Sequence, residues 1–481
     1  MLKLVGTLRN GSRYSPVSSN WCLSNHQAIG ALSTTTSLQK IVLQEYAESK
    51  NSMTNRVFKS LKDDQKSESD DVINTTETIL KDKKNEKQKI TKAKKIIPSA
   101  NIMSFGVGDL NESFADVKGI SLVESVKLMS SLATRQRRVK PLLKTLADNI
   151  NNTKSELGIK NIADILYSMA KLNFRNELLL KKLSIDLQKA IESVDQSPIV
   201  GSILTSLGML KYRNDQLMDE LCKWCIKNKK IIRTQDLCAM VLTLATIGYV
   251  PVDSDILFTE VLGNLKETDM TKSSEWLDVV WSLTILNRVT SEKISSVLDE
   301  NFHIKLADPT NIPLAKKHKL LNINAYAKSL LDNYKGPLIQ SNSPVFDAPL
   351  VRTKDKQVFV KSITDALANL FPSRDHFRLN VDGGTGFLTD IEFYLDKKGT
   401  PLIIDNINND TTVLRIAILA NYYHDYCLGK NSLLGSVLLH QRLLEANGYK
   451  IINISHSDLH TDDKLLTRIT YISNRLKTIV K

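Results

Sequence analysis

A repeat in the middle of the chain constrains the fold more than any other feature of the sequence. In five segments a large apolar residue is followed directly by a small one, at positions 133, 170, 208, 245 and 284. A second large apolar residue stands four positions before each small one, so the three side chains share one face of a helix. The segments are Leu132-Ala133, Met169-Ala170, Leu207-Gly208, Leu244-Ala245 and Leu283-Thr284.

A second amphipathic segment follows most of these helices after a short turn. A unit of two helices and about 38 residues is typical of an α-solenoid, in which helical hairpins stack on one another. We therefore predict a helical-repeat region over residues 105–345. Its predicted second helices are Asn176–Ile191, Asp215–Ile226, Ser254–Leu265 and Ser291–Phe302.

Basic and aromatic residues stand just after the small residues, at equivalent positions of successive units. Solenoids of this kind bind peptides or single-stranded RNA, and RNA offers bases for stacking and phosphates for cations. The same cations would also suit helix C-termini, where the helix dipole favours positive charge, so two readings stay open. The candidate RNA-binding residues are Arg137, Arg138, Lys171, Arg175, Lys211, Tyr212, Arg213, Tyr249 and Arg288.

The amino-terminal residues have the composition of a targeting sequence. Residues 1–44 contain no Asp or Glu, are rich in Ser and Thr, and carry four basic side chains. This composition is typical of a mitochondrial transit peptide, so we predict import into the mitochondrial matrix. Residues 45–104 are predicted to form a disordered charged linker, because their charges are many and their large apolar side chains few.

The net charge of the chain is +13, from 65 Lys and Arg against 52 Asp and Glu. Such a balance favours an anionic partner. However, residues 1–44 contribute +4 and residues 45–100 contribute +3, which leaves +6 for the rest of the chain. An argument for RNA binding must therefore rest on the positions of individual residues.

The hydrophobic pattern changes in the last third of the chain. We predict a separate α/β region over residues 346–481, because strand-like runs alternate there with helical ones. The predicted strands are Phe387–Leu395, Pro401–Asp405, Arg415–Ala420 and Tyr449–Ile454, and the predicted helices are Leu433–Asn447 and Asp462–Lys477.

Five short motifs in this region carry a resemblance to a known family. They are Arg415–Leu419, Tyr426-Cys427, Lys430–Gly435, Gln441–Leu444 and Gly448–Ile454. Over about residues 413–472 they resemble a RAP domain, the module that closes proteins of the FAST kinase domain-containing family. The order of targeting peptide, solenoid and RAP domain also resembles that family. The resemblance implies a mitochondrial RNA-binding protein that stabilises or directs processing of transcripts.

The resemblance also implies a fold similar to PD-(D/E)xK nucleases, which raises the question of catalysis. A metal-dependent nuclease needs two acidic groups around Mg²⁺ and a lysine near the attacking water. Asp390 and Glu392 would project from one face of a strand, and Asp405 ends the next predicted strand. No Asp/Glu-x-Lys follows Asp405, so these three residues are weak catalytic candidates, and we predict no metal site. The sequence also contains no GxGxxGxV, VAIK, HRD or DFG motif of a protein kinase.

A second group of candidate RNA contacts lies where a predicted strand ends and the next helix begins. Ligands of α/β sheets gather outside the carboxyl ends of strands. Alternatively, this segment is a helix start with Ser432 as its N-cap. The candidates are His424, Tyr426, Lys430, Asn431 and Arg442.

The sequence thus predicts a mainly α-helical protein, a solenoid followed by a small α/β RAP domain. No apolar run approaches the roughly 18 residues of a membrane span. The predicted partners are single-stranded mitochondrial RNA and other mitochondrial RNA-processing proteins, and no cofactor is expected. Two alternatives stay open: a metal-dependent endoribonuclease acting through the RAP-type fold, and a peptide-binding solenoid scaffold.

Overall fold

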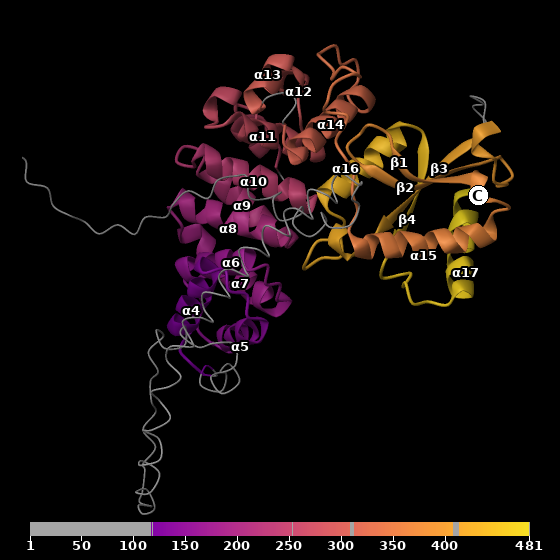
Figure 1. The fold of residues 1–481 in the computed structure, drawn as a ribbon. Helices are drawn as coiled ribbons and strands as arrows, with labels where there is room; N and C mark the ends of the chain where they lie inside the picture. Colours follow the sequence, from indigo (N-terminus) through magenta and orange to yellow (C-terminus); the bar gives the residue numbers. More distant parts are fainter. Residues whose placement is uncertain (1–116, 118, 253, 308–311, 407–412, 481) are drawn as a thin grey trace, which may run out of the picture.

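The computed structural model describes residues 117, 119–252, 254–307, 312–406 and 413–480. The predicted transit peptide, residues 1–44, and the predicted linker, residues 45–104, lie outside the described residues. The described chain forms a stack of helices with an α/β domain packed against its side (Figure 1). This arrangement confirms the predicted fold class.

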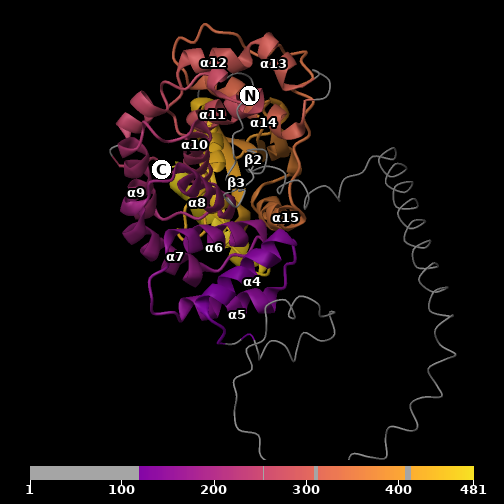
Figure 2. The same ribbon diagram turned by 90° about the vertical axis from the view of Figure 1, so that its left-hand side faces the viewer.

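Five helical hairpins form the stack. Their first helices are α4 (Leu122–Thr134), α6 (Ile159–Lys171), α8 (Ser197–Leu210), α10 (Thr234–Ile247) and α11 (Ser273–Ile285). Their second elements are α5 (Lys140–Asn151), α7 (Glu177–Ala190), α9 (Asp215–Lys227), a π-helical turn over Leu257–Val261, and α12 (Ser291–Leu298). First helices pack on first helices, and α5, α7 and α9 pack in a second layer (Figure 2).

Each first helix ends in the same backbone geometry. The residue three positions after each small residue is left-handed, with φ between 47° and 62°. The following residue donates its backbone N–H to the carbonyl of the repeated large apolar residue, as Tyr212 does to Leu207 at 3.0 Å. These are the bonds of a Schellman motif, so the repeat marks a recurring helix end. The left-handed residues are Gln136, Asn173, Lys211, Gly248 and Asn287.

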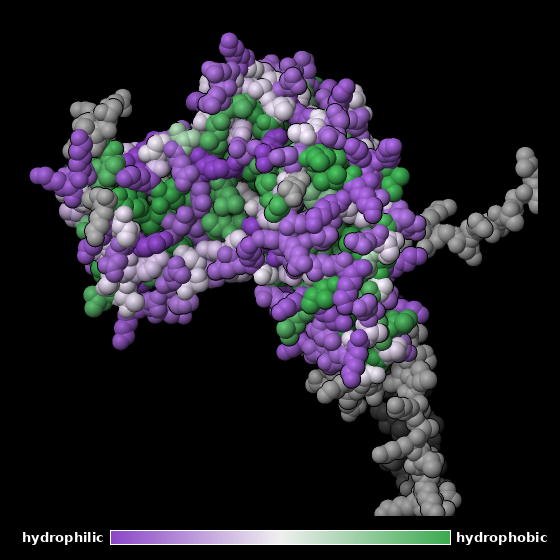
Figure 3. Space-filling model, turned by 180° about the vertical axis from the view of Figure 1, so that it is seen from behind, coloured by the Kyte–Doolittle hydropathy of each residue, from purple (hydrophilic) through white to green (hydrophobic). Residues whose placement is uncertain are grey.

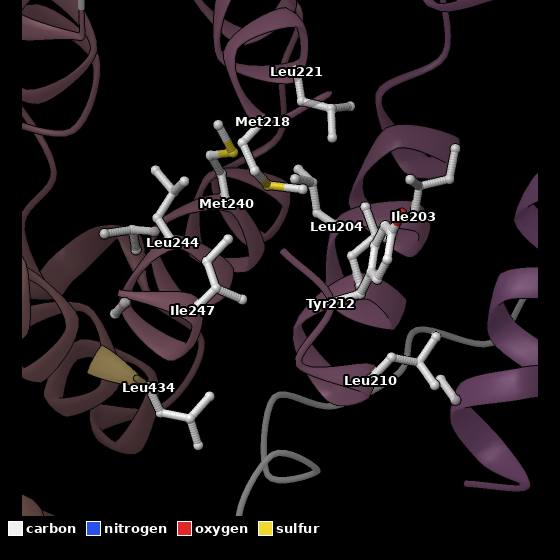
Figure 4. Close-up of a cluster of buried hydrophobic side chains, with 14 of the residues drawn as sticks. Ile203, Leu204, Leu210, Tyr212, Met218, Leu221, Met240, Leu244, Ile247 and Leu434 are labelled. Atoms are coloured by element: carbon white, nitrogen blue, oxygen red, sulfur yellow. The ribbon is translucent and has the colours of Figure 1, made fainter. Parts of the chain in front are cut away.

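The small residues allow neighbouring first helices to approach closely. A Cβ on Gly208 in α8 would lie 2.7 Å from the Thr243 Oγ1 atom of α10. Apolar side chains from α8, α9 and α10 fill the space around this contact, and Leu434 of the C-terminal domain lies at the edge of the cluster (Figure 4). The solenoid and the C-terminal domain therefore share one hydrophobic core.

Two predicted second helices differ from the structure. Ser254–Leu265 contains the π-helical turn instead of a regular α-helix. Ser291–Phe302 is interrupted at Asp299, because its side chain accepts a backbone N–H of the next turn and caps a new helix, α13 (Glu300–Leu306). A further helix, α14 (Leu314–Ser329), packs against α11 and completes the stack.

A four-stranded sheet forms the centre of the C-terminal domain. Its strands follow the order β1-β2-β3-β4, with the first three antiparallel and β4 parallel to β3. Helices α15 and α17 cover one face, and α16 covers the other as the crossover from β3 to β4. The elements are α15 (Lys354–Leu370), β1 (Phe377–Asp382), β2 (Leu388–Leu395), β3 (Leu414–Asn421), α16 (Gly435–Ala446), β4 (Tyr449–Ser455) and α17 (Leu465–Val480).

The segment Pro401–Asp405 is not the strand that the sequence predicts. It makes one isolated bridge, between Leu395 and Pro401, and then forms a 3-10 turn over Ile404–Asn406. The reason is that β1 and β3 already pair with most of both edges of β2, which leaves only its end, at Tyr394 and Leu395, for this segment.

Apolar side chains on the surface are spread over both parts of the molecule. Seen from behind, they form separate patches between hydrophilic stretches (Figure 3). The most exposed include Leu178 in α7 and Leu466 in α17, which belong to different parts of the molecule. Among the described residues, no helix is both long and apolar enough to cross a bilayer.

Candidate nucleic-acid interface

The C-terminal domain is tied to the helix ends of the solenoid by backbone hydrogen bonds. The Leu428 N–H donates to the Lys211 carbonyl at 2.9 Å, and the Arg213 N–H donates to the Leu428 carbonyl at 2.8 Å. The Cys427 thiol donates to the Ile247 carbonyl at 3.4 Å. The loop between β3 and α16 thus pairs with the helix ends of the third and fourth repeat units.

Helix α16 begins in direct contact with the solenoid. A Cβ on its first residue, Gly435, would lie 1.9 Å from the Ala245 carbonyl oxygen and 2.7 Å from Ile285 Cγ2. Two turns later, Arg442 donates to the Ile285 carbonyl. Arg442, a predicted RNA contact, is therefore part of the junction between the two parts.

Arginine occupies an equivalent position in the first three units, five residues after the small residue. Arg138 donates to the carbonyl of Asn173 at 3.0 Å, and Arg213 donates to the carbonyl of Gly248 at 3.3 Å. In both cases the acceptor is the left-handed residue of the next unit. The arginines thus link successive helix ends.

Arg175 is the third arginine of this series and lacks the corresponding bond. By the same rule its acceptor would be the Lys211 carbonyl, but that oxygen accepts the Leu428 N–H of the C-terminal domain. Arg175 is exposed, and it makes no hydrogen bond or ion pair with the other residues that the structure describes. Among the described residues, the Arg175 guanidinium is therefore unpaired at the junction.

Other polar groups surround Arg175 and form what we call the junction cluster: Arg138, Arg175, Lys211, Tyr423 and His424. The Lys211 ammonium donates to the His424 carbonyl at 3.1 Å, and Lys211 is only 7% exposed. Burial, together with the nearby Arg175 charge, lowers the pKa of Lys211 to about 8. Burial and the same two cations lower the pKa of His424.

The aromatic member of the junction cluster is accessible. Tyr423 is 42% exposed, and its ring lies over His424 with the two centroids 3.7 Å apart. Cations next to an exposed aromatic ring suit a phosphate and its attached base. The cluster is therefore chemically matched to a single-stranded nucleic acid.

A cavity of about 360 Å³ opens beside the junction cluster. Lys211 and His318 of the solenoid line one side, and the start of α15, the start of β2 and the start of α16 line the other. The cavity thus lies between the two parts of the molecule.

Asp390 and Glu392 lie on one face of β2, as predicted, but they belong to different ion-pair networks. Asp390 lies 2.7 Å from Arg352 and accepts the Ala420 N–H at 2.7 Å. Burial raises the pKa of Asp390, against the opposing effect of Lys356 and Arg352. Glu392 pairs with Arg415 at 2.9 Å.

The third weak catalytic candidate, Asp405, lies apart from both. It is exposed and pairs with Arg378 at 2.8 Å. Within the described ranges, no three His, Cys, Asp or Glu side chains are grouped closely enough to hold a metal ion. The structure therefore does not bring the three candidate carboxylates together.

Several predicted RNA contacts hold the structure together instead. Tyr212 is buried at 4% exposure, and its hydroxyl accepts a hydrogen bond from Ser184 of α7 at 3.3 Å. Arg213 pairs with Asp215 at 2.7 Å and lies over the Tyr249 ring at 4.7 Å. Lys430 reaches the same Asp215 carboxylate. These residues are not free for RNA in this arrangement.

The remaining predicted contacts are scattered. Arg137 and Asn431 are exposed, and Lys171 is half-buried. Arg288 pairs with Asp255 at 3.5 Å, at the other end of the stack from Arg137. Tyr426 is half-buried and packs on the His456 ring, with centroids 5.5 Å apart.

Sequence reasoning missed Tyr423, Arg352 and Lys356. Tyr423 lies in a short turn after β3, and the other two lie at and before the start of α15. Their approach to the solenoid depends on how the domain docks, and no local pattern encodes that. The segment Tyr422-Tyr423-His424 offered one signal, an aromatic pair directly after a strand.

The fold and the junction define a class of protein, the α-solenoids that end in a small α/β domain. Comparison with protein families identifies the relatives of this chain within that class. Residues 237–307 match FAST kinase-like protein, subdomain 1, residues 317–403 match its subdomain 2, and residues 418–475 match the RAP domain. Residues 112–258 also match the family of RNA-editing substrate-binding complex 6 protein.

Curated relatives carry the same family name. The chain is 24% identical to FAST kinase domain-containing protein 4 of Rattus norvegicus over 402 residues, 78% of this chain and 63% of that protein. It is 25% identical to the protein 4 of Homo sapiens over 342 residues, 68% and 54% of the two chains. It is 22% identical to FAST kinase domain-containing protein 2, mitochondrial, of Rattus norvegicus over 380 residues, 77% and 54%.

The chain therefore belongs to the FAST kinase domain-containing family, and its relatives include the protein 4 type. The matched regions span less than two thirds of the length of these relatives.

Proposed function

We propose that this protein binds single-stranded RNA in mitochondria and stabilises transcripts or directs their processing. One observation carries the proposal: Arg175 is exposed and unpaired among the described residues, and it lies within electrostatic range of Tyr423, Arg138 and Lys211. Neighbouring positive charges repel one another, and a bound phosphate would relieve that repulsion. The junction cluster would hold the RNA backbone, with Tyr423 stacking on a base.

The family comparisons support the same reading. A match to an RNA-editing substrate-binding complex protein covers the solenoid units that carry Arg138, Arg175 and Lys211. Relatives named as mitochondrial support a mitochondrial location, and we propose the matrix because of residues 1–44. Residues 1–44, 45–104, 105–345 and 346–481 are proposed as transit peptide, linker, repeat region and C-terminal region.

Ultraviolet crosslinking in intact organelles, followed by sequencing of the attached RNA, tests this function. We expect mitochondrial transcripts to be recovered, with crosslinked peptides from the junction cluster. Recovery of proteins without RNA would favour a peptide-binding scaffold and contradict the proposal. The matched control is the Arg175→Glu variant, in which recovery of RNA should fall.

The rival function is that of an endoribonuclease, and the surroundings of Asp390 argue against it. Its carboxylate is neutralised by Arg352 and faces Lys356, whereas metal-dependent cleavage needs grouped acidic ligands. Incubation of the purified protein with transcript RNA and Mg²⁺ or Mn²⁺ is expected to leave the RNA intact. Cleavage that is lost in Asp390→Asn would establish the rival.

RNA binding is expected to weaken as the pH rises from 7 to 9. Lys211 has a pKa of about 8, so it is charged below that pH and neutral above it. Losing one charged contact should reduce affinity about three- to tenfold. Fluorescence anisotropy of labelled RNA at pH 7.0, 8.0 and 8.8 measures this change.

The neighbours of Lys211 do not titrate in this window. The pKa of His424 is lowered and that of Cys427 is raised, both chiefly by burial, while Arg175, as an arginine, stays charged. The control is Lys211→Arg, which keeps its charge throughout and should show a flat profile. Equal slopes in the two proteins would contradict the assignment.

A further inference from the structure

The cavity between the solenoid and the C-terminal domain has the size of a small-molecule site. Its volume is about 360 Å³, at the lower end of the roughly 300–1,000 Å³ of ligand pockets. Lys211 and His424 line the cavity and also lie near Arg175, so the cavity opens next to Arg175. A ligand bound in it would therefore be continuous with one held by the junction cluster.

The charges that line the cavity leave one cation without a carboxylate. Arg352 pairs with Asp390 at 2.7 Å, and Lys356 pairs with Asp425 at 2.9 Å. Lys211 is as deeply buried, but among the described residues its ammonium donates only to the His424 carbonyl, and the Asp425 charge acts on it without an ion pair. A buried ammonium paired with a carbonyl alone is costly, because a neutral partner offsets little of its lost hydration. The arrangement favours an anionic ligand group at Lys211.

Two polar atoms in the cavity lining have no hydrogen bond with any described group. They are His318 Nε2 and Asp390 Oδ1, and the latter touches Arg352 as an ion pair without hydrogen-bond geometry. Buried polar groups are normally satisfied, so such atoms need an explanation. With the His318 pKa lowered by burial, its Nε2 is an acceptor once the other ring nitrogen donates to Pro349. Because Asp390 Oδ1 already contacts Arg352, His318 Nε2 is the acceptor of this pair that a ligand N–H or O–H group would satisfy.

The rest of the lining mixes apolar residues with polar ones such as Asn421 and Ser436, and it includes an aromatic pair. Phe387 and His440 stack with their centroids 4.9 Å apart and their planes 18° from parallel. Burial lowers the pKa of His440 to about 3, so its ring is neutral at physiological pH. A planar heterocycle with polar edges would fit these walls and meet the His318 acceptor.

We propose that the cavity binds one nucleotide of the RNA, with its base and ribose inside and its phosphate at Lys211 and Arg175. The proposal rests on the proposed function and names the part of the RNA that enters the protein. The nucleotide is either a 5′-phosphorylated end or an internal residue turned out of the strand. Both present the same chemistry to the cavity.

Filling the cavity tests the proposal. Ser436 lines it from the first turn of α16, is half-buried and makes no hydrogen bond with other described residues. Ser436→Trp should abolish binding of adenosine, cytidine, guanosine and uridine 5′-monophosphates, measured by calorimetry, while Ser436→Ala should bind them as the natural protein does. For RNA of about 12 nucleotides, within the usual site sizes, Ser436→Trp should lose about tenfold in affinity.

Thermal unfolding shows whether Ser436→Trp remains folded, and Lys211→Met provides a second variant that leaves the cavity open. Lys211→Met should weaken binding of the 5′-monophosphates but not of the unphosphorylated nucleosides. Three RNAs of one sequence distinguish the two sources of the nucleotide: one with a 5′-phosphate, one with a 5′-hydroxyl, and one blocked at both ends. Tighter binding of the 5′-phosphorylated RNA than of the 5′-hydroxyl RNA supports a strand end. Equal binding of the RNA that is blocked at both ends supports an internal nucleotide.

The proposal is overturned if no 5′-monophosphate binds the natural protein at millimolar concentration and Ser436→Trp binds RNA normally. In that case RNA binding that is sensitive to Arg175→Glu would leave the proposed function intact. Absence of all RNA binding would instead remove the proposed function itself.

Discussion

Replacing Arg175 by glutamate is expected to weaken binding of single-stranded RNA by about ten- to a hundredfold. A hydrogen bond to a charged group contributes about 1.5–3 kcal/mol, and each 1.4 kcal/mol is a factor of ten. The new carboxylate would also repel phosphate. Because Arg175 makes no hydrogen bond or ion pair with other described residues, the free energy of unfolding should hardly change.

Salt titration of the same variant separates a phosphate contact from general electrostatics. The slope of log affinity against log salt should fall in magnitude by about 0.7 for each lost phosphate contact on a single strand. The control is Lys181→Glu, which makes the same change of net charge at an exposed site on α7, in the other helix layer. Equal losses in the two variants would refute a specific role for Arg175.

Replacing Gly435 by alanine is expected to loosen the C-terminal domain from the solenoid. The added Cβ would meet the Ala245 carbonyl oxygen at 1.9 Å, and backbone on both sides must move. Overpacking of this kind costs about 1–3 kcal/mol, which corresponds to a melting temperature lower by several degrees. The gain in helix propensity, about 1 kcal/mol at most, does not offset it.

Calorimetry and limited proteolysis measure the effect. We expect earlier cleavage in the junction loop between β3 and α16 and a separate low-temperature transition. Gly158→Ala is the matched control, because a Cβ there meets nothing within 4 Å and the residue has an ordinary φ. An unchanged melting curve for Gly435→Ala would show that the close approach does not hold the two parts together.

The solenoid is the part of the fold that sequence reasoning predicts well. Its helices recur with a fixed period, and both the apolar face and the small residue are visible in a single sequence. The left-handed residues are only partly visible, because Asn173, Gly248 and Asn287 are types that favour this conformation but Gln136 and Lys211 are not. For the same reason the packing of Tyr212 into the core could not be foreseen.

Only part of the junction cluster can be predicted from the sequence. Arg175 and Lys211 follow from the repeat, since both stand just after a small residue. Tyr423 and His424 join them only because the domain docks there, and the hydrogen bond between Lys211 and His424 spans 213 residues of sequence. Likewise, α15 and β1 were not predicted, so Arg352 and Lys356 could not be placed beside Asp390.

The composition of the junction cluster has a consequence for the whole molecule. Arg175 and Lys211 belong to the solenoid, whereas Tyr423 and His424 belong to the C-terminal domain. RNA bound at the cluster would therefore contact both parts at once, and only the docked arrangement brings these residues together. Binding free energies are reciprocal, so docking and RNA binding each favour the other. RNA bound at the junction cluster is therefore expected to stabilise the docked arrangement of the two parts of the chain.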